Sequence, residues 1–153
     1  MALTIGVPRE TEAGETRVAF IPSVADRLHK TTDATVVVES GAGARAFHSD
    51  ADYEDAGCTV ADRAAVFDAD IVLKVAPPSS EEIEMLASGQ VVAGFMRPLD
   101  EPETAQALAE AGVTALSMEL VPRISRAQKM DALSAMGSLG GYRAAVVAAE
   151  RLP

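Results

Sequence analysis

The chain has 153 residues, of which 48% are hydrophobic and 24% charged, so it can bury one substantial core and is not intrinsically disordered. Its net charge of −10 comes without a basic stripe and excludes a nucleic-acid-binding role, because phosphate binding depends on clustered Lys and Arg. Apolar runs fall short of the roughly 20 residues of a membrane helix, and the opening MALTIGVPRE is charged where a signal peptide is apolar, so we expect a soluble, cytoplasmic protein.

Apolar segments suited to strands alternate with segments of helical period along most of the chain. We expect strands at 3–7, 35–39, 58–60, 71–75, 91–95 and 113–118, and helices at 22–30, 51–56, 61–67, 80–86 and 103–111. Such alternation is typical of crossover units feeding a parallel sheet, and continuously apolar strands are typical of sheets covered on both faces. The sequence therefore predicts an α/β fold with an open, mostly parallel sheet flanked by helices, flavodoxin-like or Rossmann-like.

The last part of the chain differs in character. Residues 121–130 are polar and basic within an otherwise acidic sequence and predict a loop, and a long helical pattern begins at Asp131. We expect residues 1–130 to form the α/β domain and residues 131–153 to begin a linker helix into a second domain. No closing element follows that helix, so we expect the chain to be part of a longer protein.

A glycine-rich stretch, Gly41-Ala42-Gly43-Ala44-Arg45, follows the second predicted strand and partly matches a dinucleotide-binding fingerprint. The helix that the fingerprint requires does not follow, and no acidic residue stands at the usual distance. We interpret this stretch as a surface loop.

Charged residues gather where a binding crevice is expected. Arg9, Glu10, Glu15 and Arg17 follow the first strand, and the carboxyl edge of an open α/β sheet usually carries the crevice. A solvent-exposed charge cluster is an equally good reading of this group. Lys74 stands within an apolar strand, where burial of its charge is costly unless an anion or the crevice receives it.

Other reactive residues carry little signal. Cys58 is expected to be a small buried side chain, His29 to lie at a helix end and His48 to be solvated. We predict no metal site and no serine-histidine-aspartate set.

Several motifs together resemble a known family. Ile5-Gly6-Val7-Pro8-Arg9-Glu10, Glu15-Thr16-Arg17-Val18-Ala19, Val38-Glu39-Ser40-Gly41-Ala42-Gly43 and Leu73-Lys74-Val75 resemble the amino-terminal domain shared by alanine dehydrogenase and nicotinamide nucleotide transhydrogenase. Residues 121–128, VPRISRAQ, and 130–134, MDALS, are similar to the transhydrogenase α subunit specifically. The resemblance covers essentially the whole chain.

The resemblance implies the first part of an NAD(H)-binding component that transfers hydride between NAD(H) and NADP(H), coupled to proton translocation. NAD(H) would be bound together with a second, Rossmann-type domain, and NADP(H) would lie on a partner subunit. The partners implied are the NADP(H)-binding and membrane subunits, and the complete subunit is expected to be a homodimer. The chain would be cytoplasmic and peripheral to the membrane, and inactive by itself.

The same resemblance implies the cofactor-binding residues, which are Arg123, Gln128, Lys129, Asp131 and Ser134. A nicotinamide carboxamide offers donors and an acceptor that Gln128, Asp131 and Ser134 can satisfy, and Arg123 can anchor Asp131 or a phosphate. Lys129 stands where a serine is expected. No residue is assigned a catalytic role, because hydride transfer needs positioning and no general base.

Two alternative functions remain open at this point. Arg17 and Lys74 correspond to residues that hold a substrate carboxylate in alanine dehydrogenases, but residues 94–99, GFMRPL, lack the histidine that accompanies them there. The chain would then be the substrate domain of an amino-acid dehydrogenase. The other alternative is a non-catalytic, flavodoxin-like regulatory domain.

Overall fold

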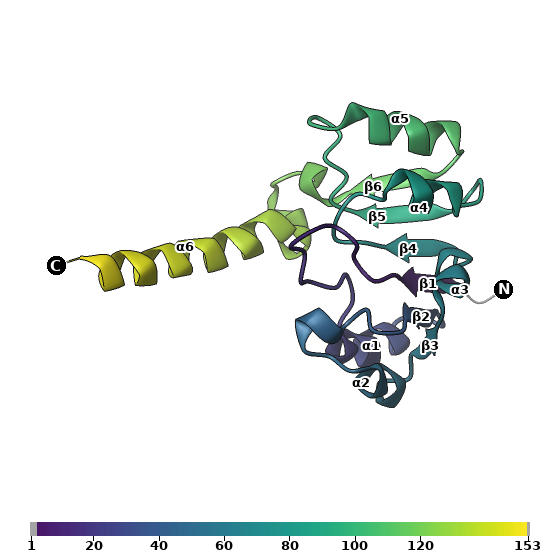
Figure 1. The fold of residues 1–153 in the computed structure, drawn as a ribbon, viewed down its shortest axis with the longest axis horizontal. Helices are drawn as coiled ribbons and strands as arrows, with labels where there is room; N and C mark the ends of the chain where they lie inside the picture. The colour runs from purple at the N-terminus through teal and green to yellow at the C-terminus, as the bar shows by residue number, and fades with distance from the viewer. Residues whose placement is uncertain (1–2, 153) are drawn as a thin grey trace. The chain divides into compact units, whose positions relative to one another are not determined.

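The computed structural model describes residues 3–152 and divides into two compact units, with the boundary between Ser117 and Met118. The first unit contains all the strands of the described sheet (Figure 1). The domain division expected at residue 130 stays a prediction.

Six parallel strands form one sheet in the order β3-β2-β1-β4-β5-β6. The strands are β1 (Thr4–Val7), β2 (Thr35–Glu39), β3 (Thr59–Ala61), β4 (Ile71–Leu73), β5 (Val91–Gly94) and β6 (Thr114–Ser117). This is the strand order of the doubly wound Rossmann fold, in which the order reverses between β1 and β4. The fold class predicted from the sequence is confirmed, and every strand pair is parallel.

Five helices of the first unit connect the strands. They are α1 (Pro22–His29), α2 (Asp50–Asp55), α3 (Arg63–Phe67), α4 (Ser80–Glu84) and α5 (Pro102–Glu110), and a short 3-10 helix, η1 (Ala44–Ala46), precedes α2. Helices α2, α3 and α4 begin at side-chain caps, Ser49, Asp62 and Ser79, that accept a hydrogen bond from the third helical residue.

Helices pack on both faces of the sheet because successive side chains of a strand point to opposite faces. Ile5 and Val7 join one buried cluster, which also contains Val36, Val38 and Tyr53. Gly6 faces α3 instead, and a Cβ there would lie 2.1 Å from the Val66 carbonyl oxygen. Glycine at this position therefore allows α3 to approach the central strand closely.

Strand β4 is shorter than the sequence predicts, ending at Leu73 instead of residue 75. The backbone amides of Val75 and Ala76 donate to the Glu10 carboxylate, at 2.5 and 3.3 Å, instead of to a neighbouring strand. Lys74 consequently lies just beyond the strand end, at the carboxyl edge of the sheet.

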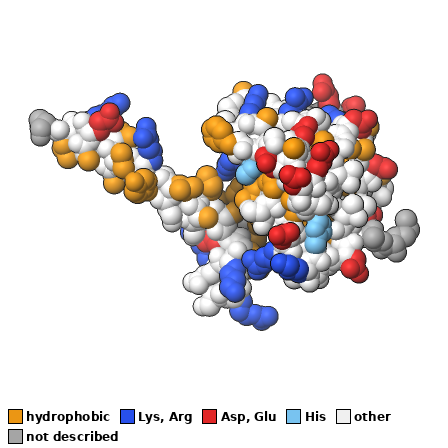
Figure 2. Space-filling view, turned by 90° about the horizontal axis from the view of Figure 1, so that it is seen from below, with side chains coloured by type: hydrophobic (Ala, Val, Ile, Leu, Met, Phe, Trp, Pro, Cys, Tyr) orange, Lys and Arg blue, Asp and Glu red, His pale blue; other side chains and the backbone are white. Residues whose placement is uncertain are grey.

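The second unit consists of two 3-10 helices, η2 (Met118–Leu120) and η3 (Ser125–Met130), followed by α6 (Ala132–Arg151). The long terminal helix is confirmed. Figure 2 shows hydrophobic side chains along α6, where Leu139 and Tyr142 are exposed. Within residues 3–152, no helix is both long and apolar enough to cross a membrane.

Candidate functional site

Cavities follow the carboxyl edge of the sheet in the first unit. Three of them have volumes of about 410, 690 and 490 Å³, and Thr11, in the loop after β1, lines all three. Ligand pockets of small molecules have volumes in this range. In doubly wound folds the ligand usually lies where the strand order reverses, which here is the end of β1 and β4.

Six side chains of alternating charge surround that point, and we call them the charge ring. In order around the ring they are Arg9, Glu39, Arg63, Glu82, Lys74 and Glu10. Arg63 lies 2.8 Å from Glu39 and is also paired with Glu82, and Arg9 Nε lies 3.9 Å from Glu39. Because Arg9 and Glu10 are adjacent in sequence, the ring closes through the backbone, and its formal charges cancel.

Lys74 is the most buried cation of the ring, with a side chain 1% exposed. Its Nζ lies 3.0 Å from Glu82 and 3.3 Å from Glu10. The anion that the sequence requires beside Lys74 is therefore supplied by the chain itself. Two carboxylates offset the desolvation of the ammonium, and the point of strand reversal is occupied by internal ion pairs.

Arg17 and Glu15 form a bidentate salt bridge. Arg17 Nε and Nη2 donate to the two carboxylate oxygens of Glu15 at 2.8 and 2.6 Å, and the Arg17 backbone amide donates to one of them. The side-chain hydrogen bonds lower the pKa of Glu15 and raise that of Arg17. The four charged residues after β1 are thus divided: Arg9 is exposed, Glu10 is buried, and Glu15 and Arg17 form a partly exposed pair.

Arg97 stands in the stretch where the alanine dehydrogenases carry a histidine. Its backbone is left-handed, with φ of 48°, and its guanidinium donates to Glu12 at 2.9 and 3.0 Å and to Glu101 at 3.3 Å. These hydrogen bonds raise the pKa of Arg97. The pairs tie the loop after β5 to the loop after β1.

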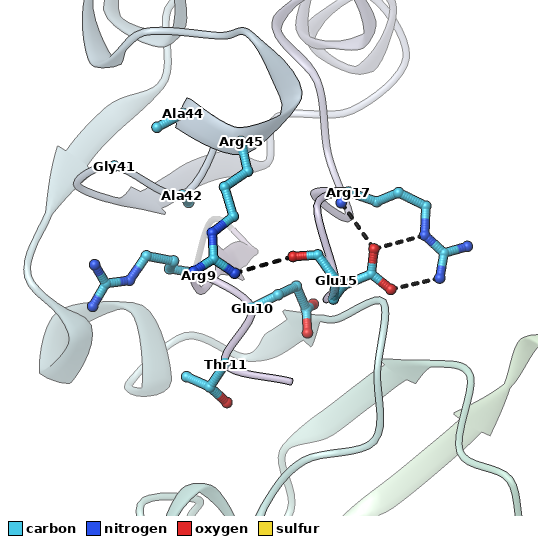
Figure 3. A pocket seen from close by; sticks show the side chains of 9 residues that line it. All are labelled: Arg9, Glu10, Thr11, Glu15, Arg17, Gly41, Ala42, Ala44 and Arg45. Carbon is cyan, nitrogen blue, oxygen red and sulfur yellow. Dashed lines mark hydrogen bonds and ion pairs between the residues drawn. The ribbon is translucent and has the colours of Figure 1, made fainter. Parts of the chain in front are cut away.

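The cavity of about 410 Å³ lies between the loops that follow β1 and β2. Figure 3 shows Arg45 reaching from η1 toward Glu15, with the guanidinium groups of Arg9 and Arg17 on either side of it. Arg45 Nη1 donates to the Glu15 carbonyl oxygen at 3.2 Å. The Gly41 amide donates to Asp50 at 2.8 Å, and the amides of Ala42 and Ala44 bond within the loop. These amides already donate to partners in the chain and are not available to a pyrophosphate. This supports the interpretation of the stretch as a surface loop and not as a dinucleotide fingerprint.

The remaining reactive residues have structural surroundings. Cys58 is buried, and burial raises the pKa of its thiol. His48 makes an edge-on ring contact with Tyr53, and the exposed His29 lies beside Gly57 at the end of α1. No cluster of potential metal ligands occurs in the described part of the chain.

In the second unit the structure places the predicted cofactor residues around the start of α6. Asp131 caps this helix and accepts hydrogen bonds from the Ser134 amide at 3.0 Å and the Ser134 hydroxyl at 2.5 Å. Those bonds, with a smaller contribution from the charge of Arg123, lower the pKa of Asp131. Gln128 and Lys129 are exposed on η3, and Arg123 is exposed before it. The structure brings Asp131 and Ser134 together and leaves the other side chains accessible.

Sequence reasoning missed half of the charge ring. Glu39, Arg63 and Glu82 come from β2, α3 and α4 and were not singled out as site residues. The one available signal was the pattern Ser79-x-x-Glu82, a capping box that the structure confirms. Nothing local indicates that Glu82 also reaches Lys74.

The fold and the charged carboxyl edge define an α/β domain of the doubly wound class. Residues 6–140 match the model of the family described as alanine dehydrogenase/PNT, N-terminal domain, and the chain belongs to this family. It is 46% identical over 95% of its length to the NAD(P) transhydrogenase subunit alpha of Cereibacter sphaeroides, and 36% identical over 98% to the alanine dehydrogenase of Bacillus subtilis. The family resemblance seen in the sequence is confirmed.

A solved structure shows the same fold. The crystal structure of transhydrogenase from Sinorhizobium meliloti superimposes with a TM-score of 0.91 at 41% identity, covering 96% of this chain and 44% of that one. The chain spans 28% of the Cereibacter subunit and 39% of the Bacillus enzyme. It therefore corresponds to less than half of each relative.

Proposed function

We propose that this chain is the amino-terminal part of the NAD(H)-binding component of a proton-translocating NAD(P) transhydrogenase. NAD(H) is bound together with a further domain, NADP(H) lies on a partner subunit, and the complete subunit is a homodimer. The component is cytoplasmic and reaches the membrane through its partner subunits.

The observation that carries this proposal is the identity of 46% with a transhydrogenase α subunit over 95% of the chain. That stretch includes residues 121–134, which resemble the transhydrogenase α subunit. The internal ion pairs at the point of strand reversal also support it, since they leave the nucleotide to be bound elsewhere.

The residues around the start of α6 suit a nicotinamide carboxamide. Gln128 is exposed and offers both a donor and an acceptor, and Asp131 is kept ionised by its hydrogen bonds from Ser134. Arg123 and Lys129 add positive charge that suits a phosphate. When bound, NAD(H) supplies the hydride, and these residues fix the orientation of the ring.

The alanine dehydrogenase relatives favour a second candidate, an amino-acid-dehydrogenase substrate domain. Two features of the described structure weigh against it. Lys74 is enclosed by Glu10 and Glu82, and Arg97 stands in the stretch that lacks the histidine. No feature of the structure favours the non-catalytic regulatory alternative.

A chimeric subunit tests the proposal. The chain replaces the matching segment of the Cereibacter α subunit, and the product is assembled with the partner subunits of that enzyme. We expect reduction of an NADP⁺ analogue by NADH and no NAD⁺-dependent oxidation of L-alanine. A chimera that folds, binds NADH and oxidises L-alanine without nucleotide-to-nucleotide transfer would establish the second candidate instead.

A further inference from the structure

The cavity between the loops after β1 and β2 is not used by the proposed function. It has a volume of about 410 Å³ and is lined by three arginines, Arg9, Arg17 and Arg45, together with two acids, Glu10 and Glu15. This excess of arginine is unusual, because the first unit, which contains the cavity, is strongly acidic. The three arginines therefore give this cavity a local positive charge that can attract an anion.

Both acids of this cavity are already neutralised. The Glu10 carboxylate faces Lys74 Nζ at 3.3 Å and accepts two backbone amides. The Glu15 carboxylate is taken by the guanidinium and the amide of Arg17. Neither carboxylate therefore competes for the other two arginines.

Arg9 and Arg45 retain most of their donors. Among residues 3–152, the only partner of the Arg45 guanidinium is the Glu15 carbonyl oxygen, which uses one Nη1 hydrogen. The Arg9 side chain is 59% exposed, and its guanidinium approaches only Glu39, at 3.9 Å, while Glu39 is bound more closely by Arg63 at 2.8 Å. Figure 3 shows the Arg45 side chain extended into the space between Arg9 and Arg17.

The same cavity has open space at Gly41. Gly41 lines the cavity with φ of 76°, and a Cβ at this position would meet no atom within 4 Å. Arginine is suited to phosphate and carboxylate because its planar donors can contact two oxygens at once. We infer that this cavity binds a small multivalent oxyanion, phosphate or carboxylate, through Arg45 and Arg9.

Isothermal titration of the chain with inorganic pyrophosphate and with citrate, in low-salt buffer, tests this inference and distinguishes the two anion classes. We expect saturable binding of at least one of them to a single site, weakened by added NaCl. Arg45→Gln should lower the affinity at least tenfold. The matched control Arg27→Gln, on exposed α1, should change it less than twofold.

A second variant keeps Arg45 in place. Ala44 lines the same cavity and is exposed, so Ala44→Glu adds a negative charge there and should also weaken binding at least tenfold. Melting temperatures of all variants verify folding. Binding of neither anion by the unaltered chain, or equal affinities for the unaltered chain and Arg45→Gln, would overturn the inference. The result is independent of NAD(H), so it does not bear on the proposed function.

Discussion

Lys74 shows how a buried charge is tolerated when the chain provides its own counter-ions. Its ammonium contacts Glu82 at 3.0 Å and Glu10 at 3.3 Å, and all three side chains are at most 3% exposed. Removing the ammonium would leave Glu10 buried without an ion-pair partner, which costs more than the group contributes when complete. Lys74 therefore has a structural role in this conformation.

We expect Lys74→Met to lower the free energy of unfolding of the chain by about 3–5 kcal/mol, because Glu10 loses the ammonium it pairs with and Glu82 is left with Arg63 alone. Urea unfolding measures this, with Lys30→Met, at the exposed end of α1, as the control. In the chimeric subunit the exchange rate per folded molecule should be unchanged. A collapse of the rate with unaltered stability would contradict the structural role.

Gln128 is expected to act by orienting the nicotinamide ring. Gln128→Asn shortens the reach by one methylene, and a displacement of about 1 Å can cost on the order of a hundredfold in rate. We expect that loss in the hydride-transfer rate of the chimeric enzyme, with a much smaller change in NADH affinity. Gln106→Asn, the same substitution on exposed α5, is the control. Equal losses of rate and affinity would mean that Gln128 only contributes to binding.

Asp131 is expected to position the cofactor without exchanging a proton. Its hydrogen bonds from Ser134 lower its pKa, so it stays a carboxylate throughout pH 6–8. The pH profile of the hydride step, measured with soluble components, should be nearly flat over that range in the chimeric enzyme and in Asp131→Asn. A bell-shaped profile that loses one limb in Asp131→Asn would show that Asp131 handles a proton.

At the scale of elements, short helices are fixed to the sheet by a few specific contacts. Helix α2 has six residues, too short to be stable alone, and is held by its Ser49 capping box and by buried Tyr53. The Tyr53 hydroxyl donates to the Phe20 carbonyl oxygen at 2.8 Å, joining α2 to the loop before α1. Burial raises the pKa of Tyr53 to about 12.

This raised pKa predicts a loss of stability in alkali. The unfolded chain releases the Tyr53 proton above about pH 10, its ordinary value, whereas the folded chain keeps it until about pH 12. The contribution is complete below pH 10 and is lost as the pH rises toward 12. Tyr53→Phe should lower the free energy of unfolding by about 1 kcal/mol at pH 8, because the hydrogen bond to Phe20 is missing. Between pH 8 and pH 11 this free energy should fall less in Tyr53→Phe than in the unaltered chain. Urea unfolding at pH 8 and at pH 11 measures both effects, and Tyr142→Phe, on exposed α6, is the control. If the free energy of unfolding depends on pH in the same way in Tyr53→Phe and in Tyr142→Phe, the prediction is wrong.

At the scale of the whole molecule, the chain is expected to bind NADH weakly when alone. The residues from Arg123 to Ser134 would contact only the nicotinamide end of the cofactor, and ordering exposed side chains adds a cost. Fluorescence titration should give a dissociation constant above about 100 µM, because only half of the contacts to the cofactor are present. The chimeric subunit is the positive control. Low-micromolar binding by the chain alone would show that this half suffices.

The sequence predicted the elements well because their signals are local. Short apolar runs at residues 36–38 and 91–93 indicated β2 and β5. The relation between Asp131 and Ser134 is also local, since a side chain three residues before a helical amide is within reach of it. These features follow from spacing along the chain.

What the sequence by itself determined is therefore the α/β class, the order of its elements and the family. Tertiary structure decided which charges meet: Glu10 and Lys74 are 64 positions apart and come together only because β1 and β4 are neighbours in the sheet. It also decided that Arg17 and Lys74 are paired internally while Arg45 keeps free donors in a cavity. Ion pairs between distant segments depend on strand order and register, which periodicity along one strand does not encode.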